Sequence, residues 1–417
     1  MCAIPAASCH KKTPQDGPTL TVQELEAAHL ARFDLGPGYP QLPVPEYVTR
    51  IYLDDRIEAM SLQTAPAWTP ASQASMDKEL DSAVRAFIGL PTTAGRDEPP
   101  YLRTTFTGST ALDRVVSSVK RFARAVKAPE IDVVTTTPSI DIMRLFLEEH
   151  AEIKPHFVES RKRNRMGALD VDRLRTALRA AKADRRTLVC LLTSPENPTG
   201  EHWSEVELRG IAEDCVELDA ILIVDHTFAV SGVQSETIPK IWDLAPSGLR
   251  WLATWDTGKT FGLNEDKLGF IVAGDRGLVD FVDEALAVMQ FGVARRQKLF
   301  FTQVIQEAID SDYLGELRTV CRQNLAVLVK GLKGTSIKVR KPSAGSMALL
   351  DFSATGYTDE EVRQALLREN VGVISGNVFF HGDWVPRSYV RVALARPAEH
   401  FADAVELIAK RFAGSAG

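Results

Sequence analysis

Lys259 is the residue in this sequence best suited to covalent chemistry. It follows an apolar, strand-like run, residues 251–257, within the segment WDTGKTFGLNEDKLGF. An amine at the end of a buried strand is partly desolvated, which lowers its pKa and favours a Schiff base with a carbonyl compound. An ordinary surface lysine is the alternative, and this segment taken alone does not exclude it.

Two other apolar runs are followed by groups that could bind a ligand. Asp225 ends the run AILIVD, and a carboxylate at the carboxyl end of a strand in an α/β sheet lies in the ligand crevice. A solvated aspartate at a strand end is an equally simple explanation. Asn197 lies in TSPENPTG, which follows a buried strand and could also be only a proline-rich turn.

A third kind of candidate is a group that could bind an anion. Thr107, Gly108 and Ser109 stand just before an apolar-periodic helix, where backbone N–H groups could meet a phosphate, although a simple helix N-cap explains them too. Arg391 lies inside the strand-like run YVRVALAR. A buried guanidinium is costly unless it is paired, so a carboxylate ligand explains Arg391 better than a structural ion pair.

Taken together and in this order, the segments resemble the aminotransferase class I/II family of pyridoxal 5′-phosphate (PLP) enzymes, fold type I. The resemblance runs from about residue 104 to residue 391, and Asn-Pro-Thr-Gly at residues 197–200 is the signature of that family. It implies that Lys259 holds PLP as a Schiff base and moves the α-proton of a free L-α-amino acid, through external aldimine and quinonoid intermediates. It also implies a homodimer with its active site at the subunit interface.

The resemblance also implies roles for the other candidates. Asp225 would pair with the pyridine nitrogen, which lets the ring accept electrons. Asn197 would bond the ring 3′ oxygen and lie beside the substrate, and Arg391 would bind the substrate α-carboxylate. The residues expected to hold the phosphate are Thr107, Gly108, Ser109, Thr257 and Lys267.

Three positions depart from the family pattern. Phe228 replaces a tyrosine that donates to the 3′ oxygen, so the pKa of the internal aldimine should rise. Asp256 replaces a phosphate-binding serine, and we expect its carboxylate to face the substrate or another cation. Lys267 replaces an arginine, which keeps the charge but gives up the bidentate fork.

This combination of departures is similar to a small group of PLP-dependent arginine oxidases and hydroxylases of nonproteinogenic amino-acid biosynthesis. The segments VFFHGDW and YVRVALAR are similar to theirs as well. Tyr39, in GPGYPQ, stands where that group has a histidine needed for oxidative chemistry, which puts arginine hydroxylation in doubt. We expect Tyr39 to lie near the substrate.

The expected function is therefore a specialised reaction of an amino acid on PLP. It could be elimination or replacement at Cβ or Cγ, or oxygen-dependent oxidation or hydroxylation. An ordinary amino-acid aminotransferase and a non-catalytic sensor with a PLP-enzyme fold are the alternatives. The substrate side chain stays open, since Asp256 suggests a cationic or hydroxylated group and the stretch around Phe379 and Phe380 suggests a small apolar one.

The composition narrows the class of partner. The net charge of -6 and the pI near 5.8 argue against nucleic acid or an anionic membrane. No apolar run approaches the roughly 20 residues that span a bilayer. The five cysteines are scattered without metal-ligand spacing, which favours reduced thiols in a cytoplasmic protein and no metal site.

The pattern of elements predicts an α/β fold. Helical periodicity at 76–90 and 112–126 is followed by strand-like runs that alternate with helical segments, which predicts a mainly parallel sheet, seven-stranded by the resemblance. The expected parts of the chain are a mobile tail (1–20), an N-terminal segment packed on the small domain and active site (21–74), a large PLP-binding domain (75–290) and a small α+β domain (291–417).

Three local features complete the expectations. The glycine- and proline-rich loop at residues 36–43 is either an active-site cover or a plain connection. The helical tract at residues 295–332 is too long for one ordinary helix and should break between residues 311 and 315. The segment VVTTTPSIDIM, where an aromatic side chain would stack on the PLP ring, offers no Phe, Tyr or Trp.

Overall fold

The computed structural model of the protein describes residues 16–57, 70–91, 99–160, 170–234, 236–290, 292–382 and 388–413. The first helix, α1 (Asp16–Leu30), begins at Asp16, so residues 16–20 are helical rather than part of a tail. Pro18 lies in its first turn, where a proline costs no hydrogen bond. Residues 1–15 of the expected tail lie outside the described part of the chain.

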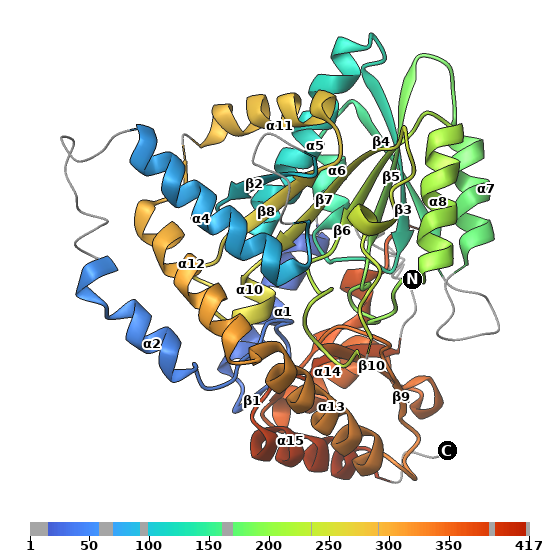
Figure 1. The fold of residues 1–417 in the computed structure, drawn as a ribbon. Helices are drawn as coiled ribbons and strands as arrows, with labels where there is room; N and C mark the ends of the chain where they lie inside the picture. The colour runs from blue at the N-terminus through green and yellow to red at the C-terminus, as the bar shows by residue number, and fades with distance from the viewer. Residues whose placement is uncertain are drawn as a thin grey trace, which may run out of the picture.

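A seven-stranded sheet lies at the centre of the molecule, as the sequence predicted (Figure 1). Its strand order is β2-β8-β7-β6-β5-β3-β4, and only β8 runs antiparallel to its two neighbours. The strands are β2 (Tyr101–Thr105), β3 (Glu130–Thr137), β4 (Ile153–Glu159), β5 (Arg186–Thr193), β6 (Ile221–Asp225), β7 (Arg250–Asp256) and β8 (Gly269–Ala273).

Helices cover both faces of this sheet. Alternate strand residues face opposite sides: Val133 and Leu191 belong to one apolar core, and Val134 and Leu192 belong to the other. The first core is covered by α5 (Gly108–Ala125), α6 (Met143–Glu148) and α11 (Arg276–Met289). The second is covered by α7 (Val171–Ala181), α8 (Glu205–Glu217), and the short α9 (Ile241–Leu244) and α10 (Gly258–Phe261).

The C-terminal part of the chain forms a smaller α+β unit below the main sheet in Figure 1. Its antiparallel sheet has the order β12-β13-β10-β9. Its elements are α12 (Arg295–Asp310), α13 (Tyr313–Gly331), β9 (Lys338–Arg340), β10 (Met347–Asp351), η1 (Ser353–Thr355), α14 (Asp359–Arg368), β11 (Val371–Gly372), β12 (Ile374–Ser375), η2 (Gly376–Phe379), β13 (Tyr389–Ala393) and α15 (Ala398–Arg411).

The long helical tract is divided where the sequence predicted. Helix α12 ends at Asp310 and α13 begins at Tyr313. Between them Asp312 adopts a left-handed conformation with φ of 50°, which Asn and Asp tolerate better than other side chains. Further along the chain lie two short strands: β11 pairs with the N-terminal β1 (Phe33–Asp34), and β12 pairs with β13.

The N-terminal segment contributes α1, β1, α2 (Glu46–Tyr52) and α4 (Pro70–Ile88). Helix α1 packs against β11, β12 and η2 of the C-terminal unit, while α4 packs against α12. Sequence patterns did not locate β1, β2, β4 or β9. Edge strand β4 shows why, since its Pro155 and its partly exposed side chains break the apolar run that marks a buried strand.

Candidate active site

A cavity of about 310 Å³ lies where the main sheet, the N-terminal segment and the C-terminal unit meet. Most residues singled out from the sequence line it: Tyr39, Gly108, Ser109, Asn197, Asp225, Phe228, Asp256, Lys259, Lys267 and Arg391. Asp225 and Asp256 are the last residues of β6 and β7, so this cavity lies at the carboxyl ends of the strands.

Asp225 is held rigidly at the end of β6. Its Oδ1 accepts hydrogen bonds from the Thr227 backbone N–H (3.0 Å), the Thr227 hydroxyl (2.6 Å) and the Thr254 hydroxyl (3.0 Å). Burial nevertheless raises the pKa of this carboxyl, although the threonine bonds oppose the shift. A buried carboxylate with Oδ2 left toward the cavity is suited to bind a cationic N–H group.

Arg391 is 5% exposed and lies on β13. It donates to Asn197 Oδ1 (3.0 Å) and to the Gly36 carbonyl (2.7 Å), and its guanidinium lies 4.6 Å from the centre of the Phe379 ring. Burial lowers its pKa to about 10. Among the described residues it forms no ion pair, and its buried Nε has no hydrogen-bond partner. A substrate carboxylate would supply the missing negative charge.

The Lys259 amine faces the cavity from α10, directly after β7. Burial lowers its pKa, and the neighbouring Lys267 and Arg391 lower it further, while Asp256 opposes the shift. The Nζ atom lies 5.5 Å from the centre of the Tyr39 ring. A depressed pKa leaves more of the amine neutral, which is the nucleophilic form that attacks a carbonyl.

The N-terminus of α5 forms a close contact with Asp256. A Cβ on Gly108 would lie 2.5 Å from Asp256 Oδ2, so only glycine fits at this position. Asp256 Oδ1 accepts the backbone N–H of Lys259 at 3.0 Å. These contacts place the Asp256 carboxylate at the start of both α5 and α10, beside the positions expected to hold phosphate. Its assignment to the substrate stays a prediction.

The remaining expected phosphate ligands differ in their placement. Ser109 lines the cavity, and Lys267 lines it while donating to Asn264 Oδ1 at 3.0 Å. Thr107 is the N-cap of α5, because its hydroxyl accepts the Thr110 backbone N–H, and its role at the phosphate stays a prediction. The Thr257 hydroxyl accepts the backbone N–H of Leu268 at 2.9 Å. Neither threonine lines the cavity.

Phe228 is 2% exposed and lines the cavity opposite Gly38. An added Cβ on Gly38 would lie 3.5 Å from the Phe228 ring, 3.1 Å from Met347 and 3.8 Å from Arg391. The loop at residues 36–43 therefore passes directly over this wall, with Pro37, Gly38 and Tyr39 in the lining. Of the two expectations for this loop, the contacts match the active-site cover.

The sequence reasoning missed several residues of the lining. His29 and Leu25 reach the cavity from α1, Ile374 from β12, and Asp141 and Phe146 from the turn after β3 and from α6. Phe146 lies just beyond the segment that we searched for a stacking aromatic side chain. A search extended by one helical turn would have found it, and Phe146 becomes a candidate for that contact.

His29 connects two other residues at the mouth of the cavity. Its Nδ1 lies 2.8 Å from Asp34 Oδ2, and its Nε2 lies 3.4 Å from the Tyr39 hydroxyl. Asp34 is itself fixed by the Gly36 backbone N–H and by Gln41. Asp34, His29 and Tyr39 thus form a chain of polar contacts that ends on the ring facing Lys259.

These residues fit PLP. The cavity offers a desolvated amine at Lys259, a buried carboxylate at Asp225 suited to a protonated pyridine nitrogen, and the N-terminus of an 18-residue helix with Lys267 nearby for the phosphate. The negative charge of Asp256 disfavours an anion at the N-terminus of α5, and the positive charge of Lys267 offsets it. Within the described ranges, no cluster of His, Cys, Asp and Glu could bind a metal ion, and no helix has the length and apolarity of a transmembrane span.

The comparisons with known proteins agree with this geometry. The chain is similar over 257 residues to a histidinol-phosphate aminotransferase of Anaeromyxobacter sp., with 28% identity, 60% of this chain and 63% of that protein covered. The matched stretch is thus under two thirds of that relative.

Solved structures are similar over nearly the whole chain. N-succinyldiaminopimelate aminotransferase from Mycobacterium tuberculosis superposes with a TM-score of 0.77 at 21% identity, covering 95% of this chain and 98% of that one. MppP, soaked with the product 2-ketoarginine, gives a TM-score of 0.72 at 20% identity, covering 90% and 98%. At these identities the likeness shows the fold.

The family model for aminotransferase class I and II matches residues 127–408, which is more than half of the chain and includes Asn197, Asp225, Lys259 and Arg391. The protein therefore belongs to the aminotransferase class I and II family.

Proposed function

We propose that the enzyme carries out a specialised PLP-dependent reaction on a free L-α-amino acid, rather than ordinary transamination. PLP supplies an electron sink for the carbanion formed when the α-proton leaves. The Lys259 amine, released by the substrate, takes that α-proton and can return it elsewhere. Arg391 binds the α-carboxylate, and Asp225 holds the pyridine nitrogen.

The observation that carries this proposal is the Asp34, His29 and Tyr39 chain. Transamination needs one group to move the proton, and Lys259 can do this alone. Here the Asp34 carboxylate lies at the Nδ1 atom of His29, a position that favours the proton on Nδ1 and leaves Nε2 to face the Tyr39 hydroxyl. Burial raises the pKa of Tyr39, so this hydroxyl keeps its proton. The pocket therefore has a second acid–base group beside the reacting amine.

This second group revises one doubt drawn from the sequence. Tyr39 stood in place of the histidine expected for oxidative chemistry, yet His29 lies next to it at the cavity. MppP, a structural neighbour, was soaked with its product 2-ketoarginine, a keto acid that keeps the whole arginine side chain. These points favour oxygen-dependent oxidation or hydroxylation over elimination or replacement.

The charges around the cavity favour a substrate with a cationic side chain. Among its lining residues, Asp141 and Glu265 have no hydrogen-bond or ion-pair partner in the described chain. Asp225 and Asp256 add two carboxylates, against Lys259, Lys267 and Arg391. Bound phosphate and a substrate carboxylate add further negative charge, so a second positive charge on the substrate would balance the site.

Ordinary transamination is the competing function, and the curated relatives support it. Purified enzyme should be incubated with L-arginine, L-lysine, L-glutamate and L-leucine, with and without oxygen and a keto-acid acceptor. We expect oxygen-dependent release of ammonia from the cationic substrates with no need for the acceptor. Stoichiometric conversion of the cofactor to pyridoxamine phosphate, with turnover only when a keto acid is added, would establish the transaminase instead.

We also propose a homodimer, as is typical of this family. Sedimentation of the enzyme at several concentrations would test it, because a monomer at micromolar concentration contradicts the proposal.

A further inference from the structure

Helix α1 delivers Leu25 and His29 to the cavity, yet it lies at the N-terminal end of the described chain. It packs against β11, β12 and η2 of the C-terminal unit and against β1 of its own segment. The packing is close, because an added Cβ on Gly36 or Gly372 would lie 2.7 Å or less from atoms of Ala28. Apolar packing is not directional, so a specific polar contact would fix the position of the helix along this surface.

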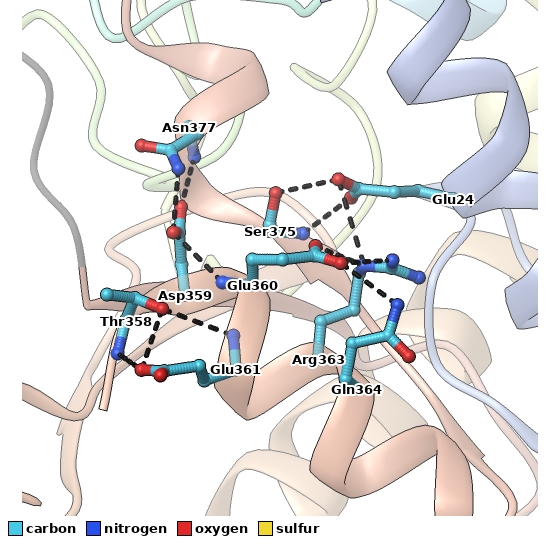
Figure 2. A network of polar contacts seen from close by, with 9 residues as sticks. All are labelled: Glu24, Thr358, Asp359, Glu360, Glu361, Arg363, Gln364, Ser375 and Asn377. Carbon is cyan, nitrogen blue, oxygen red and sulfur yellow. Dashed lines mark hydrogen bonds and ion pairs between the residues drawn. The ribbon is translucent and has the colours of Figure 1, made fainter. Parts of the chain in front are cut away.

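Glu24 makes that contact. Its side chain is 1% exposed, and its carboxylate accepts the Ser375 backbone N–H at Oε2 and the Ser375 hydroxyl at Oε1, both at 2.8 Å. Figure 2 shows Glu24 reaching from α1 to Ser375, with Arg363 of α14 below. Arg363 Nε lies 3.8 Å from Glu24 Oε1 and is shared with Glu360.

The segment that contains Ser375 is itself held by hydrogen bonds. Asp359, at the start of α14, accepts the backbone and side-chain N–H groups of Asn377 at 2.8 and 2.7 Å (Figure 2). A capping box between Thr358 and Glu361 fixes the same helix end. Ser375 is therefore a fixed point, and Glu24 is the group that attaches α1 to it.

The contact is adjacent to the active site on both sides. Ser375 follows Ile374, which lines the cavity and pairs across the sheet with Arg391. Glu24 precedes Leu25, which also lines the cavity. Burial raises the pKa of the Glu24 carboxyl, and the Ser375 and Arg363 contacts oppose this. Burying a carboxylate costs free energy, so a buried Glu24 is expected to have a structural or functional role.

We propose that Glu24 is a positioning residue: its contact with Ser375 holds helix α1, and with it Leu25 and His29, in place over the substrate cavity. This inference rests on the proposed active site but not on which reaction takes place there. Loss of the contact should loosen α1 and open the mouth of the cavity, while the Lys259 end, which belongs to the large sheet, keeps its structure.

The test compares Glu24→Gln, Glu24→Ala, Ser375→Ala and the double variant Glu24→Ala/Ser375→Ala. Glu26→Gln is the matched control, since Glu26 is an exposed carboxylate on the same helix. Glutamine keeps the volume of the side chain, so the Glu24→Gln protein is expected to fold even where Glu24→Ala fails. It still weakens the contact, because one carboxylate oxygen is replaced by an amide donor that faces the donors of Ser375. The readouts are backbone hydrogen exchange of residues 24–30 in the holoenzyme and the separate values of kcat and KM.

We expect exchange in residues 24–30 to become about tenfold faster or more in both Glu24 variants, from the loss of bonds to a buried charged group. KM should rise about tenfold, with kcat changing less, and Glu26→Gln should match the native enzyme. Hydrogen exchange and KM of the double variant should match those of Glu24→Ala, because the two substitutions remove the same contact.

Native exchange in α1 of a folded Glu24→Gln protein would overturn the proposal. So would additive effects of Glu24→Ala and Ser375→Ala. Hydrogen exchange needs no turnover, so it gives an answer even if every amino acid tested proves inert, which would count against the proposed function and not against Glu24.

Discussion

The two ends of the cavity are built in different ways. At the Asp225 end, consecutive parallel strands bring the groups together, and three donors fix a single carboxylate oxygen. At the α1 end, residues from the N-terminal segment and from the C-terminal unit meet, and Glu24 and Ser375 join them across 351 positions of sequence. The Asp225 end is built into the central sheet, whereas the α1 end is formed by a helix that packs against another part of the chain.

This difference suggests a division of labour. Cofactor binding needs a rigid frame, since the charges that tune PLP must not move. Substrate entry needs an element that can open, and a docked helix held by a few contacts has a lower opening cost than a central strand. Changes at the Asp225 end should therefore impair cofactor chemistry, and changes at the α1 end should impair substrate handling.

The largest effect is expected from Asp225→Asn. The variant keeps the size and some hydrogen bonds but loses the negative charge that pairs with the pyridine nitrogen. We expect kcat/KM to fall about 10³-fold, the scale of removing one partner of a buried ion pair. Steady-state kinetics and the cofactor spectrum would measure it. Activity within about tenfold of native would remove Asp225 from the cofactor site.

Arg391→Gln should have the next largest effect, on the substrate rather than the cofactor. Loss of the guanidinium that faces the α-carboxylate should weaken amino-acid binding about 10²-fold. Titration of the cofactor spectrum with the amino acid would give the apparent affinity. An unchanged affinity would mean that Arg391 serves Asn197 and Gly36 only as a structural residue.

The rigid end should also show in the pH dependence of stability. His226, next to Asp225, is buried, accepts the Ile241 backbone N–H at Nε2, and has its Nδ1 3.0 Å from the Ser194 carbonyl. Burial lowers its pKa to about 3. Because the unfolded chain binds the proton more readily, the stability contributed by neutral His226 is complete above pH 6.5 and is lost as pH falls toward 3.

This loss should amount to about 2 kcal/mol at pH 5 for the single group. Chemical denaturation at pH 7 and pH 5 would measure it against His226→Gln, in which the pH dependence should be smaller by that amount. Equal pH dependence in the two proteins would show that His226 is not buried in neutral form.

The smallest effect is expected at the α1 end, from His29→Gln. Lys259 can still take the α-proton, so loss of His29 should reduce the oxygen-dependent product about tenfold while exchange of the substrate α-proton with solvent continues. Product analysis and NMR of the α-proton would separate the two steps. A parallel loss of both would place His29 in the first step and weaken the case for a second acid–base group.

The sequence predicted the Asp225 end well, because this end depends on local patterns. Asp225 ends a buried strand, Asn197 and Lys259 each follow one, and strands that run parallel end at one edge. The α/β class with a seven-stranded sheet was confirmed. The break between α12 and α13 was predicted correctly as well.

The α1 end was largely missed, since it depends on contacts between distant segments. No local pattern marks Glu24, His29 or Asp141 as more than exposed polar residues. Tyr39 was predicted near the substrate from a resemblance rather than from its surroundings. Thr107 and Thr257 were expected at the phosphate, and that role stays a prediction. The Thr107 hydroxyl accepts the backbone N–H of Thr110, and the Thr257 hydroxyl accepts that of Leu268, bonds that sequence alone does not reveal.

Covalent attachment at Lys259 is the central claim, and one measurement tests it directly. The holoenzyme should be reduced with borohydride and digested, and the pyridoxyl-labelled peptide identified by mass spectrometry. We predict that the label lies on Lys259 and that Lys259→Ala carries none. A label on Lys267, the other lysine lining the cavity, or a reducible yellow protein that persists in Lys259→Ala, would contradict the account.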